Sequence, residues 1–264
     1  MYAFQYHQPA NVSAAVADLA QKDSKILAGG MTLLPTMKQR LAAPAALVDL
    51  GRVNELVGIR REGDSIAIGA MTRHVDVATS DVVLAAIPAL ASLAAGIGDP
   101  AVRNRGTIGG SVANNDPAAD YPAGVLALGA TIVTNKRRIE AEAYFHGLFE
   151  TSLEAGEIIT LVSFPIPQKA AYVKFPSPAS RYALVGVFVA KGAGGVRVAV
   201  TGAGANGVFR LPEFETALNA NFAPSAIEGL KVDASGLSGD MHGDSDYRAH
   251  LIGVMAKRAV IAAG

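Results

Sequence analysis

The first 55 residues alternate short apolar runs with segments of helical spacing. Apolar runs at 25–28 and 47–50 are typical of short strands, and a further strand is expected over 4–9. Ser13 is placed to cap a helix over 14–20, and apolar residues at 33–41 recur at the spacing of a second helix. This order of strands and helices predicts a small α/β unit.

From residue 56 onward the apolar runs come in pairs. Those at 56–61 and 65–69 predict a hairpin, and Thr72 is placed to cap the helix that follows. Pro88 separates the apolar stretch 82–95 into two helices, because proline removes a helical donor. Further strands are expected over 131–134, 138–143 and 158–164.

Four prolines at 165–178 predict a domain boundary. Beyond them, apolar runs at 182–190 and 196–201 predict a hairpin, and helices are expected over 212–218 and 246–263. We therefore divide the chain into three predicted domains, with boundaries at 1–55, 56–170 and 171–264.

Composition narrows the classes of function. No run reaches the roughly 18 apolar residues of a membrane helix, and the start does not resemble a signal peptide, so a cytoplasmic protein is expected. The 23 basic and 23 acidic residues cancel, which gives no electrostatic footprint for nucleic acid. The chain has no cysteine, so an iron–sulfur cluster bound through thiolates must belong to another chain.

A stretch rich in glycine and short polar residues, 98–124, stands out against this background. Such a composition predicts a long loop whose backbone approaches a ligand, with the N–H groups of 107–111 turned toward an anion. An ordinary surface loop is the alternative. A second glycine turn, 29–32, lies between a predicted strand and a predicted helix, which is a common arrangement for binding an anion.

Other motifs are weaker. Residues 202–207 match the glycine spacing of a dinucleotide-binding loop, but Pro212 places the next helix too late, and too little chain follows for that fold. The sequence has no phosphate-binding GxxxxGK[ST] motif and no close cluster of metal ligands. It has no nucleophile elbow around Ser177 or Ser180.

Taken together, two loops resemble the pyrophosphate loops of the FAD-binding subunits of molybdenum hydroxylases, a family that includes the medium subunit of carbon monoxide dehydrogenase and the flavin domain of xanthine dehydrogenase. They are Ala28-Gly29-Gly30-Met31-Thr32 and Thr107-Ile108-Gly109-Gly110-Ser111. Residues 68–72, 116–120 and 247–251 also resemble that family, so the likeness covers essentially the whole chain. It implies an α+β fold of the PCMH type, shared with vanillyl-alcohol oxidase, in which two α/β subdomains precede a C-terminal domain of antiparallel sheet and helices.

The resemblance also implies a set of FAD-binding residues. Those near the pyrophosphate would be Ala28, Gly29, Gly30, Met31, Thr32 and Leu33 on one side, and Thr107, Gly109, Gly110 and Ser111 on the other. Asn114 and Asp120 would bond the ribose or nearby polar atoms, with loop capping as the alternative. Ile97, Leu161 and Tyr182 would lie near the flavin ring, although Tyr182 also suits an ordinary strand aromatic.

The implied function is electron transfer from iron–sulfur clusters of a partner through FAD to an external acceptor. Hydroxylation would occur on another subunit, so we expect no catalytic residue and no metal ligand in this chain. The expected partners are an iron–sulfur small subunit and a molybdopterin large subunit, in a dimer of heterotrimers. Leu184 stands where some xanthine dehydrogenases carry a lysine by the flavin, which weakens the case for NAD as acceptor. The alternatives are a stand-alone NAD(P)H-dependent flavin reductase and a nucleotide-binding module without a redox role.

Overall fold

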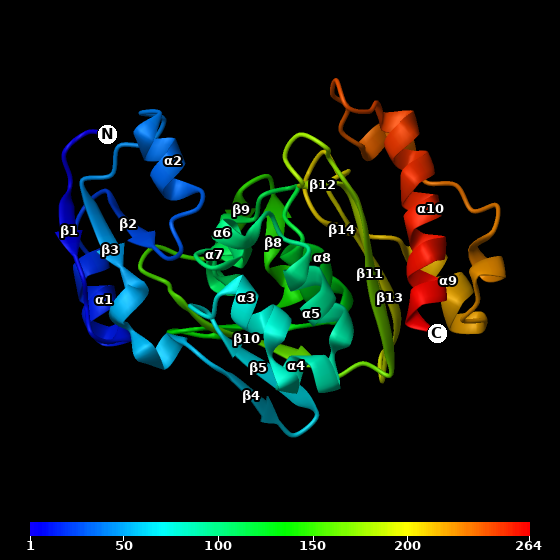
Figure 1. Cartoon of the computed structure of the whole chain (residues 1–264), viewed down its shortest axis with the longest axis horizontal. Helices are drawn as coiled ribbons and strands as arrows, with labels where there is room; N and C mark the ends of the chain where they lie inside the picture. Colours follow the sequence, from blue (N-terminus) through cyan, green and yellow to red (C-terminus); the bar gives the residue numbers. More distant parts are fainter.

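The computed structural model describes residues 1–264. Three larger sheets follow one another along the molecule, each built from a consecutive part of the chain (Figure 1). The N-terminal sheet lies at one end, and the C-terminal sheet lies at the other beside the last helix. None of the helices is both long enough and apolar enough to cross a membrane.

The N-terminal sheet is parallel, with the strand order β1-β3-β2. Its elements are β1 (Gln5–His7), α1 (Val12–Leu19), β2 (Ser24–Leu27), α2 (Leu33–Lys38) and β3 (Ala46–Asp49), followed by short 3-10 turns at Leu50–Arg52 and Asn54–Leu56. The predicted α/β unit is confirmed. The predicted cap was wrong: Asn11, not Ser13, caps α1, accepting a 2.8 Å hydrogen bond from the backbone N–H of Ala14. Asn11 is extended and lies one residue before the helix, as a cap requires.

The central sheet is antiparallel, with the order β4-β5-β10-β6-β7. Its strands are β4 (Ile59–Glu62), β5 (Ser65–Gly69), β6 (Thr131–Thr134), β7 (Arg138–Glu140) and β10 (Ile159–Pro165), and a separate small hairpin comprises β8 (Phe145–Gly147) and β9 (Glu150–Thr151). The predicted hairpin of β4 and β5 is present, and the two strands expected over 131–134 and 138–143 pair as β6 and β7. The strand expected over 138–143 ends at Glu140, where a 3-10 turn at Ala141–Ala143 begins.

Six helices lie between β5 and β6. They are α3 (His74–Thr79), α4 (Asp81–Ala86), α5 (Pro88–Ala95), α6 (Pro100–Arg103), α7 (Ile108–Asn114) and α8 (Tyr121–Ala127). Pro88 separates α4 from α5 as predicted. Thr72 does not cap α3; its hydroxyl bonds the backbone of Gly58 instead, at 3.0 and 3.2 Å, and Arg73 occupies the cap position.

The glycine-rich stretch 98–124 is mostly helical, so the prediction of one long loop was wrong. The Thr107 hydroxyl caps α7 by accepting from the N–H of Gly110. Ile108 and Val112, one helical turn apart, are fully buried in the core. A cap and two core contacts therefore hold a helix in a sequence that has few apolar residues.

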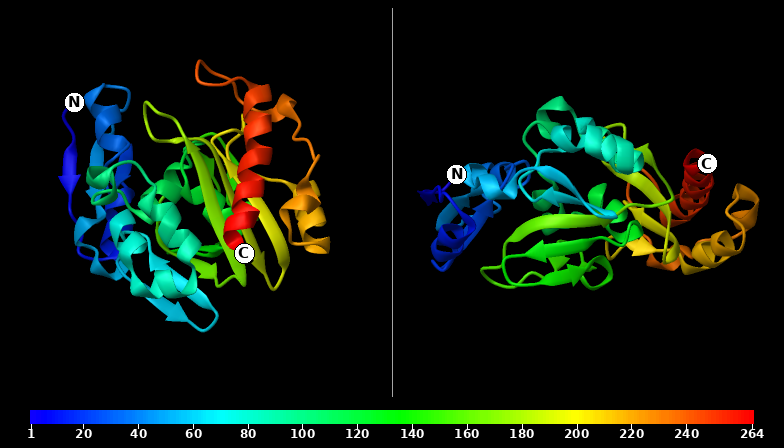
Figure 2. Two further views of the ribbon diagram at one scale, coloured as in Figure 1. Left: turned by 45° about the vertical axis from the view of Figure 1, so that its right-hand side comes forward. Right: turned by 90° about the horizontal axis from the view of Figure 1, so that it is seen from below.

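The C-terminal sheet is antiparallel in the order β11-β12-β13-β14. Its elements are β11 (Lys169–Pro176), β12 (Ala183–Gly192), β13 (Gly195–Thr201), β14 (Phe209–Arg210), α9 (Pro212–Ala220) and α10 (Ser245–Ala263), with 3-10 turns at Pro224–Ile227 and Ala234–Gly236 between the two helices. Figure 2 shows this sheet between the central helices and α10. Phe188 of β12 packs into the core of the central helices, and its neighbour Val187 packs into the core that contains α10, so both faces of β12 are buried.

The proline-rich stretch 165–178 is not a linker along its whole length, because β11 lies inside it. Pro165 and Pro176 are the last residues of β10 and β11, and β11 is an edge strand, where proline is tolerated. Only residues 166–168 connect the central sheet to the C-terminal sheet. The glycines at 202–207 form the turn between β13 and β14, so a strand of the same sheet follows where a dinucleotide-binding loop would require a helix.

Candidate functional site

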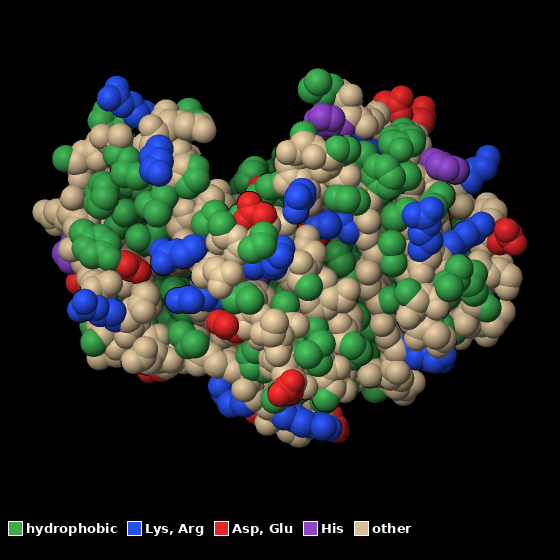
Figure 3. All heavy atoms as spheres, in the orientation of Figure 1, with side chains coloured by type: hydrophobic (Ala, Val, Ile, Leu, Met, Phe, Trp, Pro, Cys, Tyr) green, Lys and Arg blue, Asp and Glu red, His purple; other side chains and the backbone are tan.

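A cavity of about 990 Å³ lies among the N-terminal sheet, the central helices and the loop between β11 and β12. Figure 3 shows the hollow that separates the N-terminal part from the rest of the molecule. Pockets for drug-sized ligands span roughly 300–1,000 Å³. This cavity therefore has room for an elongated ligand such as a dinucleotide.

The first glycine loop presents free backbone donors to this cavity. No hydrogen bond within the chain uses the N–H groups of residues 29–33, and all five residues line the cavity wall. Gly30 adopts a φ of 76°, a conformation that residues with a side chain rarely take. Successive backbone N–H groups beside an open space are a typical arrangement for binding an anion.

In the second glycine loop, the N–H groups of residues 108–111 are not the free donors that the sequence predicts, and only that of Thr107 is unbonded. The N–H groups of Ile108 and Gly109 donate to the carbonyls of Thr72 and Ala70, at 3.1 and 2.8 Å. The N–H of Gly110 donates to the Thr107 hydroxyl at 3.1 Å, and that of Ser111 to the Thr107 carbonyl at 3.0 Å. The first turn of α7 is thus satisfied inside the protein.

Three glycines in or beside these loops are explained by close packing between segments. A methyl group at Gly29 would lie 2.8 Å from the Cα of Gly106, and one at Gly109 would lie 2.5 Å from the Cβ of Ala70. One at Gly106 would lie 2.5 Å from Nε2 of His74. Glycine is therefore needed here mainly because segments far apart in the sequence pass close to one another.

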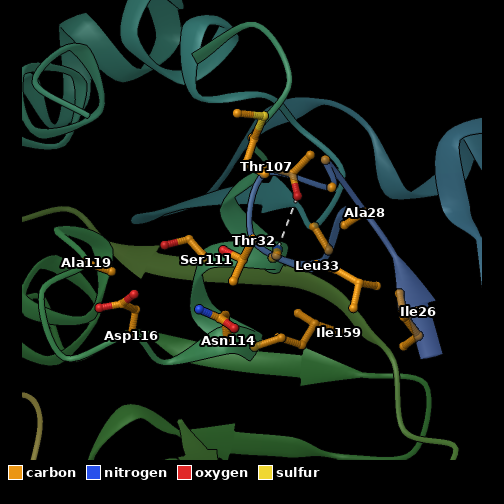
Figure 4. A pocket seen from close by; sticks show the side chains of 18 of the residues that line it. Ile26, Ala28, Thr32, Leu33, Thr107, Ser111, Asn114, Asp116, Ala119 and Ile159 are labelled. Carbon is orange, nitrogen blue, oxygen red and sulfur yellow. Dashed lines mark hydrogen bonds between the residues drawn. The ribbon is translucent and has the colours of Figure 1, made fainter. Parts of the chain in front are cut away.

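Polar side chains from several elements surround the cavity, as Figure 4 shows for Thr32, Ser111, Asn114 and Asp116. Thr32 precedes α2 and makes no side-chain capping bond to it. Asp116 accepts from the N–H of Ala118 at 2.9 Å through one oxygen.

Few positive charges line the cavity: Lys25 and Arg181 are its only lysine or arginine, beside six carboxylates. Dipoles rather than cations would hold an anion here. No group of three or more His, Cys, Asp or Glu residues is arranged to hold a metal ion.

Asp120 is buried in the cavity wall and is only 4% exposed. Its carboxylate accepts from the Tyr172 hydroxyl at 2.5 Å and from Nζ of Lys174 at 3.2 Å. Burial raises the pKa of Asp120, and the nearby Lys174 and Tyr172 oppose that shift because they favour the charged form.

His74 is a buried residue of the wall that the sequence did not single out. Its ring stacks at a tilt on Tyr121, with the ring centroids 5.3 Å apart. Nδ1 of His74 and the hydroxyl of Tyr121 are both buried without a hydrogen-bond partner. Desolvation, helped by the charge of Arg103, lowers the pKa of His74 to about 4, so the imidazole is neutral at pH 7.

The structure brings nearly all of the predicted site residues to one cavity. Those that line it are Ala28, Gly29, Gly30, Met31, Thr32, Leu33, Ile97, Thr107, Gly109, Gly110, Ser111, Asn114, Asp120 and Tyr182. Leu161 does not line it: this residue lies within β10, paired with Gly69 and Val133, whereas Ile159 of the same strand reaches the wall. The motifs 68–72 and 116–120 indicated four further wall residues, Ala70, Met71, Asp116 and Ala119. No local signal marked Ile26, His74 or the segment 153–159.

Comparison with known proteins places these features among relatives. The family model described as "FAD binding domain in molybdopterin dehydrogenase" matches residues 2–167. The chain is 37% identical to the carbon monoxide dehydrogenase medium chain of Hydrogenophaga pseudoflava, over 98% of this chain and 96% of that one. It is 36% identical to the nicotine 6-hydroxylase medium subunit of Paenarthrobacter nicotinovorans, over 99% and 98%. A solved carbon monoxide dehydrogenase from Hydrogenophaga pseudoflava, which lacks the Mo-pyranopterin moiety, superimposes with a TM-score of 0.90 over 99% of this chain and 97% of that chain.

Proposed function

The chain belongs to the family of FAD-binding subunits of molybdenum hydroxylases, and we propose that it binds FAD in the cavity between its first glycine loop and α7. The observation that carries this assignment of the site is the run of five unbonded N–H groups at residues 29–33. Such groups favour a pyrophosphate, which is the only charged part of FAD.

The proposed contacts follow from the wall of the cavity. Residues 28–33 would hold the pyrophosphate mainly through backbone N–H groups, with Met31 contributing main chain only. The second loop would act mainly by packing, because its N–H groups at residues 108–111 are already bonded within the chain. Asn114 and Asp120 would bond the ribose or nearby polar atoms, and Ile97 and Tyr182 would lie by the ring. The expected backbone contact of Leu161 with the flavin ring stays a prediction, since Leu161 is not among the residues that line the cavity.

Bound FAD supplies a centre that accepts and releases electrons, and the chain's part is to bind and orient it. Because the chain has no cysteine, iron–sulfur clusters that exchange electrons with it must lie on another subunit. The relatives are named as medium chains or subunits of larger enzymes. We propose the corresponding assembly here: an iron–sulfur small subunit and a molybdopterin large subunit, as a dimer of heterotrimers. The three-domain division 1–55, 56–170 and 171–264 and a cytoplasmic location remain proposals as well.

Two measurements on the purified chain test this function. Titration with FAD should give saturable binding with a visible flavin spectrum. Rapid mixing of the FAD-loaded chain with NADPH should leave the flavin oxidised. Absence of FAD binding would contradict the site, and fast bleaching by NADPH would contradict the subunit role in favour of a stand-alone reductase.

A further inference from the structure

The cavity-wall segment 116–120 is held in place by the C-terminal sheet in addition to two short-range bonds from Ala118 and Ala119 to Asp116. At the end of β13, the Thr201 hydroxyl donates to the carbonyls of Pro117 and Ala119, at 3.1 and 2.6 Å. The N–H of Gly202 donates to the Pro117 carbonyl at 2.8 Å. One edge of the cavity therefore depends on a sheet whose first strand begins only at Lys169.

The same sheet reaches Asp120 through β11. Nζ of Lys174 lies 3.0 Å from one carboxylate oxygen of Asp120 and 3.2 Å from the other, and it donates to the carbonyl of Gly96 at 2.7 Å. The side chains of Lys174 and Asp120 are only 11% and 4% exposed. Gly96 directly precedes Ile97, another residue of the wall. Lys174 thus joins two parts of the wall without itself lining the cavity.

We propose that Lys174 is a positioning residue of the FAD site, which favours the charged form of Asp120, fixes it against the cavity and fastens the Gly96–Ile97 turn beside it. The inference rests on the proposed function, because it concerns the wall that would face FAD. Removing the ammonium group would leave a buried carboxylate with no opposing charge, an arrangement that costs far more than a pair. Such a carboxylate takes up a proton instead.

The groups around Asp120 leave this carboxylate as the one expected to respond to the loss of Lys174. Tyr172 donates to it, and Tyr121 and Tyr182 have pKa values raised by burial, so all three stay neutral near pH 7. His74, which stacks on Tyr121, is neutral there as well, because burial lowers its pKa. Asp116 is the other carboxylate nearby, and Lys174 makes no contact with it.

The test is the pH dependence of FAD affinity in the full-length chain. FAD dissociation constants would be measured by flavin fluorescence at pH 6, 7 and 8 for the wild type and Lys174→Met. We expect the wild-type constant to change little over this range. Lys174→Met should bind roughly tenfold more weakly at pH 8, and it should recover toward the wild type at pH 6 as Asp120 is protonated.

Two matched variants separate the causes. The double variant Lys174→Met/Asp120→Asn should lose the pH dependence, because no unpaired charge remains. Lys169→Met removes an exposed lysine from the same strand and should behave as the wild type. The proposal would be overturned if Lys174→Met bound FAD as tightly as the wild type at every pH. It would also be overturned if the variant bound FAD more weakly by the same factor at every pH. Failure of the wild type to bind FAD would contradict the proposed function instead.

Discussion

Gly29 and Arg105 are in direct backbone contact: a methyl group at Gly29 would lie 2.2 Å from the carbonyl oxygen of Arg105. This contact joins the first glycine loop to the segment that leads into α7. The two loops that resemble pyrophosphate loops are therefore parts of one packed unit on the same side of the cavity wall.

Replacing Gly29 by alanine should separate these loops, because backbone cannot move aside as a flexible side chain does. We expect a loss of roughly 1–3 kcal/mol in the free energy of unfolding and a marked loss of FAD affinity. Chemical denaturation and FAD titration measure the two effects. Gly253→Ala is the control: Gly253 lies within α10 with open space around it, and alanine there should stabilise the chain by about 0.5–1 kcal/mol. Equal behaviour of the two variants would contradict the packing argument.

Thr107→Ala should remove the cap of α7 and cost about 1 kcal/mol of stability. Thr107→Ser keeps the hydroxyl that accepts from Gly110 and should retain most of that stability.

Gly110→Val should disturb the site more than Thr107→Ala, since a Cβ there would lie 2.9 Å from the Thr107 hydroxyl and 3.3 Å from the Cβ of Ala28. It should abolish FAD binding, for a steric reason and not because Gly110 needs a left-handed backbone, as this residue is helical. Unchanged FAD affinity in Gly110→Val would show that α7 is not part of the FAD site.

His74 should make the chain acid-sensitive. Its pKa is about 4 in the folded state, against 6.5 for the free side chain. The unfolded chain therefore binds a proton as pH falls below 6.5, while the folded chain stays neutral until about pH 4. Stability from this residue is complete above 6.5 and declines by up to roughly 3 kcal/mol as pH falls through that window.

Denaturation curves at pH 7, 6, 5 and 4 give the free energy of unfolding of the wild type and of His74→Gln as a function of pH. The effect of His74 is the difference between the slopes of these two pH profiles. The variant cannot titrate at this position, so its stability should fall less steeply. His250→Gln, at an exposed position on α10, should keep the wild-type slope. Identical slopes for the wild type and His74→Gln would show that His74 is not held neutral.

FAD should be released from the protein by acid precipitation, with the yellow colour in the supernatant. The chain has no cysteine, neither glycine loop contains a histidine, and His74, the one histidine on the cavity wall, is only 4% exposed. A yellow pellet would mean a covalent bond, and the same assay on His74→Gln would then test the attachment.

Local pattern was enough to predict most elements of this fold, because alternation, glycine turns and proline positions act within a few residues. It also identified both glycine loops. It failed for 98–124, where Ile108 and Val112 hold a helix through core contacts that no local window contains. The N–H groups of Ile108 and Gly109 are satisfied by Thr72 and Ala70, which a strand and a turn bring alongside. For the same reason nothing in the sequence placed Lys174 beside Asp120, 54 residues earlier.

The unbonded backbone N–H groups at residues 29–33 have a consequence for the abundance of the protein in a cell. A ligand that satisfies them and spans the opening beside the N-terminal sheet binds the folded chain but not the unfolded chain. Its binding therefore raises the free energy of unfolding by mass action. Free FAD at a hundred times its dissociation constant would contribute about 2.7 kcal/mol. Flavin supply would thereby govern how much newly made subunit escapes proteolysis, and vitamin starvation would lower its abundance before it lowered its synthesis.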